Sequence, residues 1–178
     1  MMRELQIVLA GFGGQGVLFA GKVISYAGLI ENRELSWLPS YGPEMRGGTA
    51  NCSVTLSDEP IGSPLVTEPN ALVAMNQPSF DKFIDVVADG GVVIVDTDMV
   101  PDVHERAGVK VISIPATKMA EDAGLKGLAN IVLVGRLWAE TQFCDRAVLD
   151  EAIDKCVPPR KAALIDKNKQ ALELGINA

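Results

Sequence analysis

The chain has 178 residues, of which 48% are hydrophobic, so it can bury a core of its own without disulfides or a structural metal. We expect one domain over residues 1–178. The formal net charge of −7 and the dispersed lysines and arginines argue against a nucleic acid partner. The apolar stretch before the first glycines is too short for a signal-peptide core or a membrane span, so we expect a cytoplasmic protein.

Cysteine and histidine are scarce. Cys52, Cys144 and Cys156 lie far apart without CxxC spacing, and His104 is the only histidine. Such a set does not form an iron–sulfur or a Cys/His zinc site. We expect the chain to hold no cofactor or metal by itself, and its thiols to pack as small apolar groups in a reducing compartment.

The first half of the chain is predicted to form strands separated by helices. The β-rich runs are residues 5–10, 35–38, 50–56, 71–75, 92–95 and 109–114. Between the first two, apolar residues at helical spacing predict a helix, in which Gly21 and Gly28 permit close approach to the sheet. The link from Leu38 to Ala50 is too short for a helical crossover, so the third strand is expected to run antiparallel to the second. The predicted fold is α/β, a three-layer α/β/α Rossmann-like sandwich with a largely parallel but mixed sheet.

Later segments read as helices. They are predicted at residues 78–87, 128–141, 146–157 with Asp145 as the N-terminal cap, and 161–174 ending at Gly175. The helix at 128–141 is apolar almost all round, which requires cover from the sheet or from another chain.

A glycine-rich loop is predicted between the first strand and the first helix. We predict that Gly11 permits a tight turn, Gly13 lets a ligand approach the backbone, and Gly16 brings helix and strand together. Gly14 belongs to the same loop, and the amide of Gln15 is available to a ligand. The same glycines also fit a tight turn at a packed interface.

The second strand ends in Trp37-Leu38-Pro39-Ser40, without the acid that usually binds a ribose. This weakens the alternative of a free-standing NAD(P)-dependent dehydrogenase. Asp96 and Asp98 follow a later strand, where turn and cap roles are more common than ligand or metal binding.

A second tract, residues 40–49, is rich in glycine and proline and is predicted to form an irregular loop. In it, the guanidinium of Arg46 suits a carboxylate or a phosphate, and Glu44 suits an orienting role or a pair with a neighbouring subunit. A simple surface pair between the two is the alternative.

The two tracts carry a resemblance. The sequences GFGGQGVLFAGKVI and SYGPEMRGGTANCSV resemble the gamma subunit, or gamma domain, of the 2-oxoacid:ferredoxin oxidoreductases. IGSPLV, the VVIVD strand ending at Asp96, and Ala129-Asn130 extend the match over most of the chain.

The resemblance implies a non-catalytic subunit of an enzyme that converts a 2-oxoacid, coenzyme A and oxidised ferredoxin into acyl-CoA, carbon dioxide and reduced ferredoxin. Thiamine diphosphate would lie between the partner alpha and beta subunits, and the 4Fe-4S clusters would lie in beta and, where present, in a delta subunit. The gamma chain would assemble with them, contribute to coenzyme A binding, and be inactive when isolated. The resemblance also implies interface roles facing the active-site approach for Tyr41, Gly42, Pro43, Glu44, Met45, Arg46 and Gly47.

The substrate acid stays open. 2-Oxoglutarate is our first choice, and pyruvate, a branched-chain acid such as ketoisovalerate, or indolepyruvate are alternatives. Lys118 and Lys126 suit the phosphates of coenzyme A, although solvated surface lysines are the simpler interpretation. With its partners absent, we expect an exposed surface around residues 41–47 and self-association.

Overall fold

The computed structural model describes residues 4–40 and 49–178, and it is built on a six-stranded sheet. The strand order is β2-β3-β1-β4-β5-β6. β1, β4, β5 and β6 run parallel, whereas β3 runs antiparallel to both β1 and β2, which confirms the predicted mixed sheet. The strands are β1 Glu4–Phe12, β2 Glu34–Ser40, β3 Thr49–Ser57, β4 Ala71–Ala74, β5 Val92–Asp96 and β6 Lys110–Ile114.

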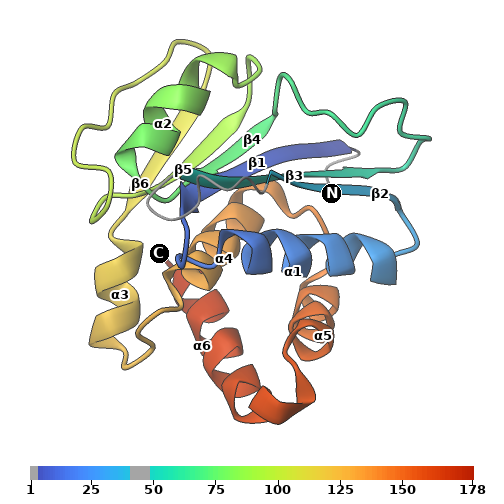
Figure 1. The fold of residues 1–178 in the computed structure, drawn as a ribbon, viewed down its shortest axis with the longest axis vertical. Coiled ribbons are helices and arrows are strands. Elements are labelled where there is room, and N and C mark those ends of the chain that lie inside the picture. Colours follow the sequence, from blue (N-terminus) through green and yellow to red (C-terminus); the bar gives the residue numbers. More distant parts are fainter. Residues whose placement is uncertain (1–3, 41–48) are drawn as a thin grey trace.

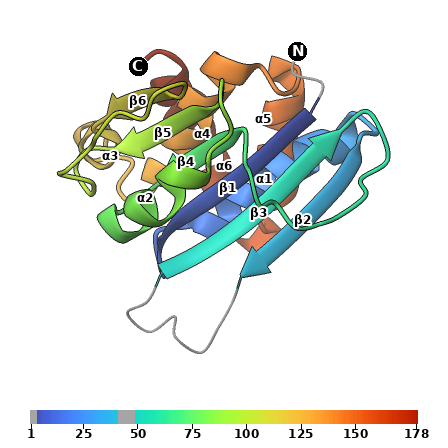
Figure 2. The same ribbon diagram turned by 90° about the horizontal axis from the view of Figure 1, so that it is seen from above.

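Helices cover the two faces unequally (Figure 1). On one face lie α1 and α4, and α5 and α6 pack against these two helices. The other face carries α2 and the short 3-10 helix η2 that follows it (Figure 2). The helices are α1 Val17–Ile30, α2 Gln77–Phe83, η2 Ile84–Val86, α3 Ala116–Asp122, α4 Ala129–Thr141, α5 Arg146–Cys156, η3 Pro159–Leu164 and α6 Ile165–Ile176.

The sheet separates two hydrophobic clusters, because successive strand residues point to opposite faces. In β1, Leu5, Ile7 and Leu9 belong to the larger cluster, on the side of α1 and α4. Val8 belongs to the smaller cluster together with Phe80 of α2. Both clusters are made of buried side chains, so the sheet is covered on both faces as the apolar strands predict.

Two glycines set how closely α1 lies against β3. A Cβ at Gly21 would stand 2.5 Å from the Cys52 sulfur, and one at Gly28 would overlap the side chain of Leu56. The predicted close approach of this helix to the sheet is confirmed.

The observed helices differ from the predicted ones at several places. The helix predicted at 78–87 is divided into α2 and η2, and α3 was not predicted. The last helix starts later than predicted, because Pro158 and Pro159 lead into η3, where Lys161 has non-helical angles (φ −118°, ψ 22°). Asp145 occupies the N-cap position of α5, but its side chain makes no capping hydrogen bond.

Gly175 does not end the last helix. α6 continues to Ile176, and Gly175 faces Gly135 of α4 across a close helix pair. A Cβ on either glycine would overlap backbone atoms of the opposite helix. The helix that is apolar almost all round is therefore covered by the sheet on one side and by α6 on the other, as its composition requires.

Candidate functional site

The glycine-rich loop leads from the end of β1 into α1, and the turn predicted at Gly11 is wrong. Gly11 is not part of a turn: it lies within β1, where a Cβ would stand 2.6 Å from Gln15 Oε1 and 2.8 Å from the Met75 Cβ. The left-handed backbone belongs to Gly14 (φ 95°) and Gly16 (φ 76°). Gly13 is exposed on the same loop.

Gln15 braces this loop from inside. Its Oε1 accepts a hydrogen bond from the Phe12 backbone N–H at 2.5 Å, and its Nε2 donates to the Met75 carbonyl at 2.8 Å. The amide that we expected to meet a ligand is thus engaged by the chain itself, and it ties the loop to the end of β4.

The starts of α1 and α4 meet at Gly16. Asn130, in the first turn of α4, donates a hydrogen bond from Nδ2 to the Gly16 carbonyl at 3.1 Å. A Cβ at Gly16 would stand 2.5 Å from that nitrogen, so only glycine fits here. Gly16 therefore brings α1 against α4, and not only against its own strand.

A cavity of about 270 Å³ adjoins this loop at the carboxyl ends of the parallel strands. We call it the glycine-loop cavity. Carboxyl strand ends are the usual place for ligands in open α/β sheets. Its walls come from the glycine loop, the ends of β4 and β5, α3 and the start of α4: Gly14, Gln15, Met75, Asp96, Met99, Thr117, Glu121, Lys126, Gly127, Ala129, Asn130 and Leu133.

The charged groups in and beside this cavity interact with other groups of the chain. Asp96 is 1% exposed and accepts a hydrogen bond from Thr117 Oγ1 at 2.6 Å. Asp98 accepts one from the Lys118 backbone N–H at 2.7 Å, so both acids hold the start of α3. Lys126 stands 3.8 Å from Glu121. The predicted turn and cap roles of the two aspartates are confirmed.

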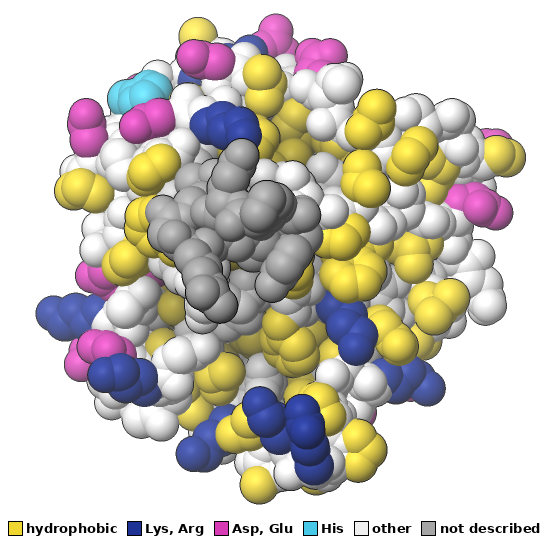
Figure 3. Space-filling view, in the orientation of Figure 1, with side chains coloured by type: hydrophobic (Ala, Val, Ile, Leu, Met, Phe, Trp, Pro, Cys, Tyr) yellow, Lys and Arg dark blue, Asp and Glu magenta, His cyan; other side chains and the backbone are white. Residues whose placement is uncertain are grey.

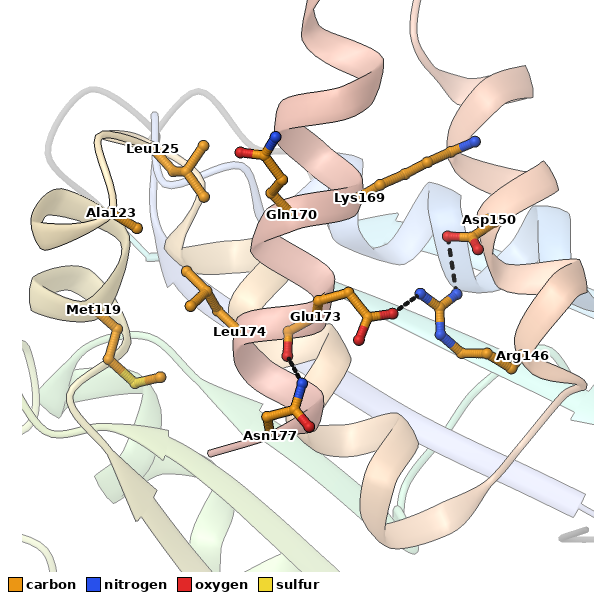
Figure 4. A pocket seen from close by; sticks show the side chains of 10 residues that line it. All are labelled: Met119, Ala123, Leu125, Arg146, Asp150, Lys169, Gln170, Glu173, Leu174 and Asn177. Carbon is orange, nitrogen blue, oxygen red and sulfur yellow. Dashed lines mark hydrogen bonds and ion pairs between the residues drawn. The ribbon is translucent and has the colours of Figure 1, made fainter.

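A larger cavity, of about 690 Å³, lies between α3, α5 and α6 (Figure 4). One end is apolar, with Met119 and Leu174. At the other end Arg146 pairs with both Asp150 and Glu173. Arg146 is thus held between two carboxylates of the chain itself, and Lys169 also lines the cavity.

The thiols and the histidine lie apart from the glycine-loop cavity. Burial raises the pKa of Cys52 to about 11, although a hydrogen bond with Trp37 lowers it in part. Burial also raises the pKa of Cys144 to about 12 and of Cys156 to about 11. The exposed His104 packs edge-on against the Phe80 ring, with 5.0 Å between ring centres. Packing roles are therefore confirmed for Cys52, and a surface position for His104.

Other predictions concern what the chain holds or where it lies. Residues 41–47 fall outside the described part of the chain. Within residues 4–40 and 49–178, no group of three or more His, Cys, Asp or Glu side chains is arranged to hold a metal ion. In the same ranges, every helix is too short or too polar to cross a membrane.

Sequence reasoning missed the role of Asn130. The residue was noted only as part of a motif, because its contact with Gly16 joins segments 114 residues apart. The available signal in the sequence was an asparagine in the first turn of a helix that is otherwise apolar almost all round.

Two similar known proteins are subunits of enzymes that act on 2-oxoacids. Ketoisovalerate oxidoreductase subunit VorA of Methanothermobacter thermautotrophicus is 42% identical over 97% of this chain. The chain spans only 36% of that relative's length. 2-Oxoglutarate synthase subunit KorC of Methanocaldococcus jannaschii is 41% identical, over 86% of this chain and 83% of KorC.

A solved structure with a similar fold is also a subunit of an oxoacid oxidoreductase. The gamma subunit of a keto/oxoacid ferredoxin oxidoreductase from Geobacter sulfurreducens superposes with a TM-score of 0.83 at 27% identity, covering 97% of this chain and 96% of that one. The family model described as pyruvate ferredoxin/flavodoxin oxidoreductase matches residues 6–178. The resemblance found in the sequence is confirmed, and the chain belongs to the pyruvate ferredoxin/flavodoxin oxidoreductase family.

Proposed function

We propose that this chain is the gamma subunit of a 2-oxoacid:ferredoxin oxidoreductase. It assembles in the cytoplasm, as one gamma-type domain, with alpha and beta subunits, and with a delta subunit where one exists. The complex converts a 2-oxoacid, coenzyme A and oxidised ferredoxin into acyl-CoA, carbon dioxide and reduced ferredoxin. The observation that carries this proposal is the family match over residues 6–178, together with a KorC relative and a gamma subunit of nearly the same extent.

In this proposal the chain is a binding and assembly subunit, and the partners hold thiamine diphosphate and the 4Fe-4S clusters. The chemistry of its described residues supports this role. Its three thiols have raised pKa values, so they are poor nucleophiles at neutral pH. Its histidine packs on a phenylalanine ring at the surface.

We assign ligand binding to the glycine-loop cavity, with Gly11 and Gln15 shaping the loop and Gly13, Gly14 and Gly16 presenting its backbone. Coenzyme A is the ligand of the complex that this subunit would contact. Residues 41–47 would face the partner subunits. An NAD(P)-dependent dehydrogenase is not favoured, since the relatives are subunits of 2-oxoacid oxidoreductases and β2 ends in Pro39-Ser40 without an acid.

The substrate remains 2-oxoglutarate by first choice. The KorC relative supports it, whereas the VorA relative favours ketoisovalerate. Pyruvate and indolepyruvate complete the set to be tested.

The test is co-expression of this chain with the alpha and beta subunits encoded by the same organism. We expect a tagged chain to co-purify with both, and the complex to reduce ferredoxin with one of the four acids only when coenzyme A is present. The chain alone should turn over none of them and should not bind NADH or NADPH below millimolar concentration. Failure to co-purify, or turnover by the isolated chain, would contradict the proposal.

A further inference from the structure

A second cavity, of about 380 Å³, lies on the other side of Asn130 from the glycine-loop cavity. We call it the lysine cavity. It is enclosed by α1, the start of α4, the end of α5, η3 and α6, and Gly127 and Asn130 line both cavities. Its polar lining residues include Lys22, Lys161, Asn130 and Asn168, and its apolar wall includes Phe19 and Leu128.

The charges of the two cavities differ. Among residues 4–40 and 49–178, no acidic residue lines the lysine cavity, although the chain has a net charge of −7. Within the described part of the chain, neither Lys22 nor Lys161 pairs with a carboxylate, and the Lys22 Nζ lies 5.5 Å from the centre of the Tyr26 ring. The described lining of the glycine-loop cavity, in contrast, includes the acids Asp96 and Glu121 and one lysine, Lys126. An anionic group is therefore favoured in the lysine cavity.

The surface charge agrees with this assignment. Figure 3 shows Lys and Arg side chains gathered at the lower end of the molecule, where Figure 1 places the turn from α5 into α6. η3 forms part of this turn, and it contributes Lys161 and Leu164 to the lining of the lysine cavity.

Two helix starts meet at the wall between the cavities. α1 begins after Gly16 and α4 after Leu128, and both residues line the lysine cavity. Neither helix has a side-chain cap or an acid in its first turn. Their first N–H groups and dipoles add to the attraction for an anion.

Two buried amide side chains in this lining each have an oxygen without a hydrogen-bond partner in the described chain. Asn130 and Asn168 are 3% and 2% exposed, and each donates through Nδ2, to the carbonyls of Gly16 and Leu164. The Oδ1 atom of each has no hydrogen-bond partner within the described chain. Because buried polar atoms normally have partners, these oxygens suit a bound group with N–H or O–H donors.

We propose that the lysine cavity binds the phosphate-bearing end of an anionic ligand, with Lys22 and Lys161 as the phosphate contacts. An uncharged, amide-containing arm of that ligand then passes Asn130 into the glycine-loop cavity. Coenzyme A has this chemistry, with phosphates at one end and an arm carrying two amide N–H groups. Its choice as the test ligand rests on the proposed function, whereas the phosphate preference rests on the cavity alone.

The test is calorimetric titration of the full chain with coenzyme A, with pantetheine, which has the arm without phosphates, and with inorganic pyrophosphate. We expect Lys22→Gln and Lys161→Gln each to weaken coenzyme A and pyrophosphate binding about three- to tenfold, since each removes one charge contact. Pantetheine binding should not change. Lys82→Gln, on α2 across the sheet, is the matched control and should change binding less than about twofold.

Equal affinity of wild type and both lysine variants for coenzyme A would overturn the proposal, as would a wild-type chain that binds neither coenzyme A nor pyrophosphate. An equal loss in Lys82→Gln would also overturn it, because that result indicates a diffuse charge effect. Thermal unfolding of each variant checks that the fold is kept. Co-purification with partner subunits separates the two proposals: assembly without a lysine effect removes only the cavity assignment, and a lysine effect without assembly removes only the gamma-subunit function.

Discussion

Two groups of glycines have opposite reasons for being glycine. Gly135 and Gly175 lie within helices. Glycine is needed at both positions because the backbones of α4 and α6 are in direct contact there. Gly14 has open space around it and is needed only for its left-handed backbone. Gly16 combines a left-handed backbone with a close neighbour, Asn130. A glycine can therefore be required for its backbone angles at one position and for the lack of space for a side chain at another. Alanine substitutions can distinguish these two requirements.

The largest effect is expected at the helix contact. In Gly175→Ala, the added methyl would overlap the Val132 carbonyl, and backbone cannot move aside as a side-chain tip can. We expect a loss of about 3 kcal/mol or more in the free energy of unfolding, measured by urea denaturation. A loss below about 1 kcal/mol would show that α6 can shift away from α4 at little cost. Close contact would then not explain why residue 175 is glycine.

An intermediate effect is expected in the loop, with Gly14→Ala as the matched control for Gly16→Ala. Both substitutions place a side chain on a left-handed backbone, at a cost of about 1–2 kcal/mol. Only Gly16→Ala adds a collision with Asn130, so it should be the more destabilising of the two. The double variant Gly16→Ala/Asn130→Ala should be less destabilised than the sum of its single variants, because it removes the collision. If the destabilisation of the double variant equals the sum for the two single variants, the collision with Asn130 contributes nothing, and the cost of Gly16→Ala comes from the left-handed backbone alone.

The smallest effect near neutral pH is expected at the three buried thiols, those of Cys52, Cys144 and Cys156, which pack as apolar groups. Their pKa values of about 11 to 12 in the folded chain exceed the ordinary value of 9.0. The folded state therefore keeps protons that the unfolded chain loses, so the contribution to stability is full below pH 9 and falls as the pH rises toward 11 and 12.

Urea unfolding at pH 8 and pH 10 measures this dependence. Cys144→Ala should decrease the loss of stability between the two pH values, since this thiol has the largest shift. Iodoacetamide should label the native thiols slowly at pH 8 and the urea-unfolded ones rapidly. Rapid labelling of the native protein would contradict the packing role.

Local sequence patterns predicted the strands and helices of this fold better than the contacts between segments distant in the sequence. All six strands and the antiparallel β3 were predicted, because apolar runs and a short link can be recognised within a few residues. α3 was missed, since it is short and starts without a side-chain cap. Gly175 was read as a helix end because the same residue type serves both as a stop and as a close contact.

The site was less predictable than the fold. The glycine loop was found, but the inward role of Gln15 depends on Met75, which is 60 residues away. The lysine cavity combines residues from α1, α4, η3 and α6, and no spacing in the sequence brings Lys22 near Lys161. Such sites depend on helix packing that a single sequence does not display.

The hydrogen bond from Asn130 to the Gly16 carbonyl also sets an order of events during synthesis on the ribosome. β1 and α1 emerge first, yet the loop between them gains this support only after residue 130 has left the exit tunnel. A nascent or truncated chain that ends before α4 can form the first strand and helix, but it holds the glycine loop without its brace. The glycine loop of this chain therefore gains its full set of supporting contacts late, when the carboxyl-terminal helices dock.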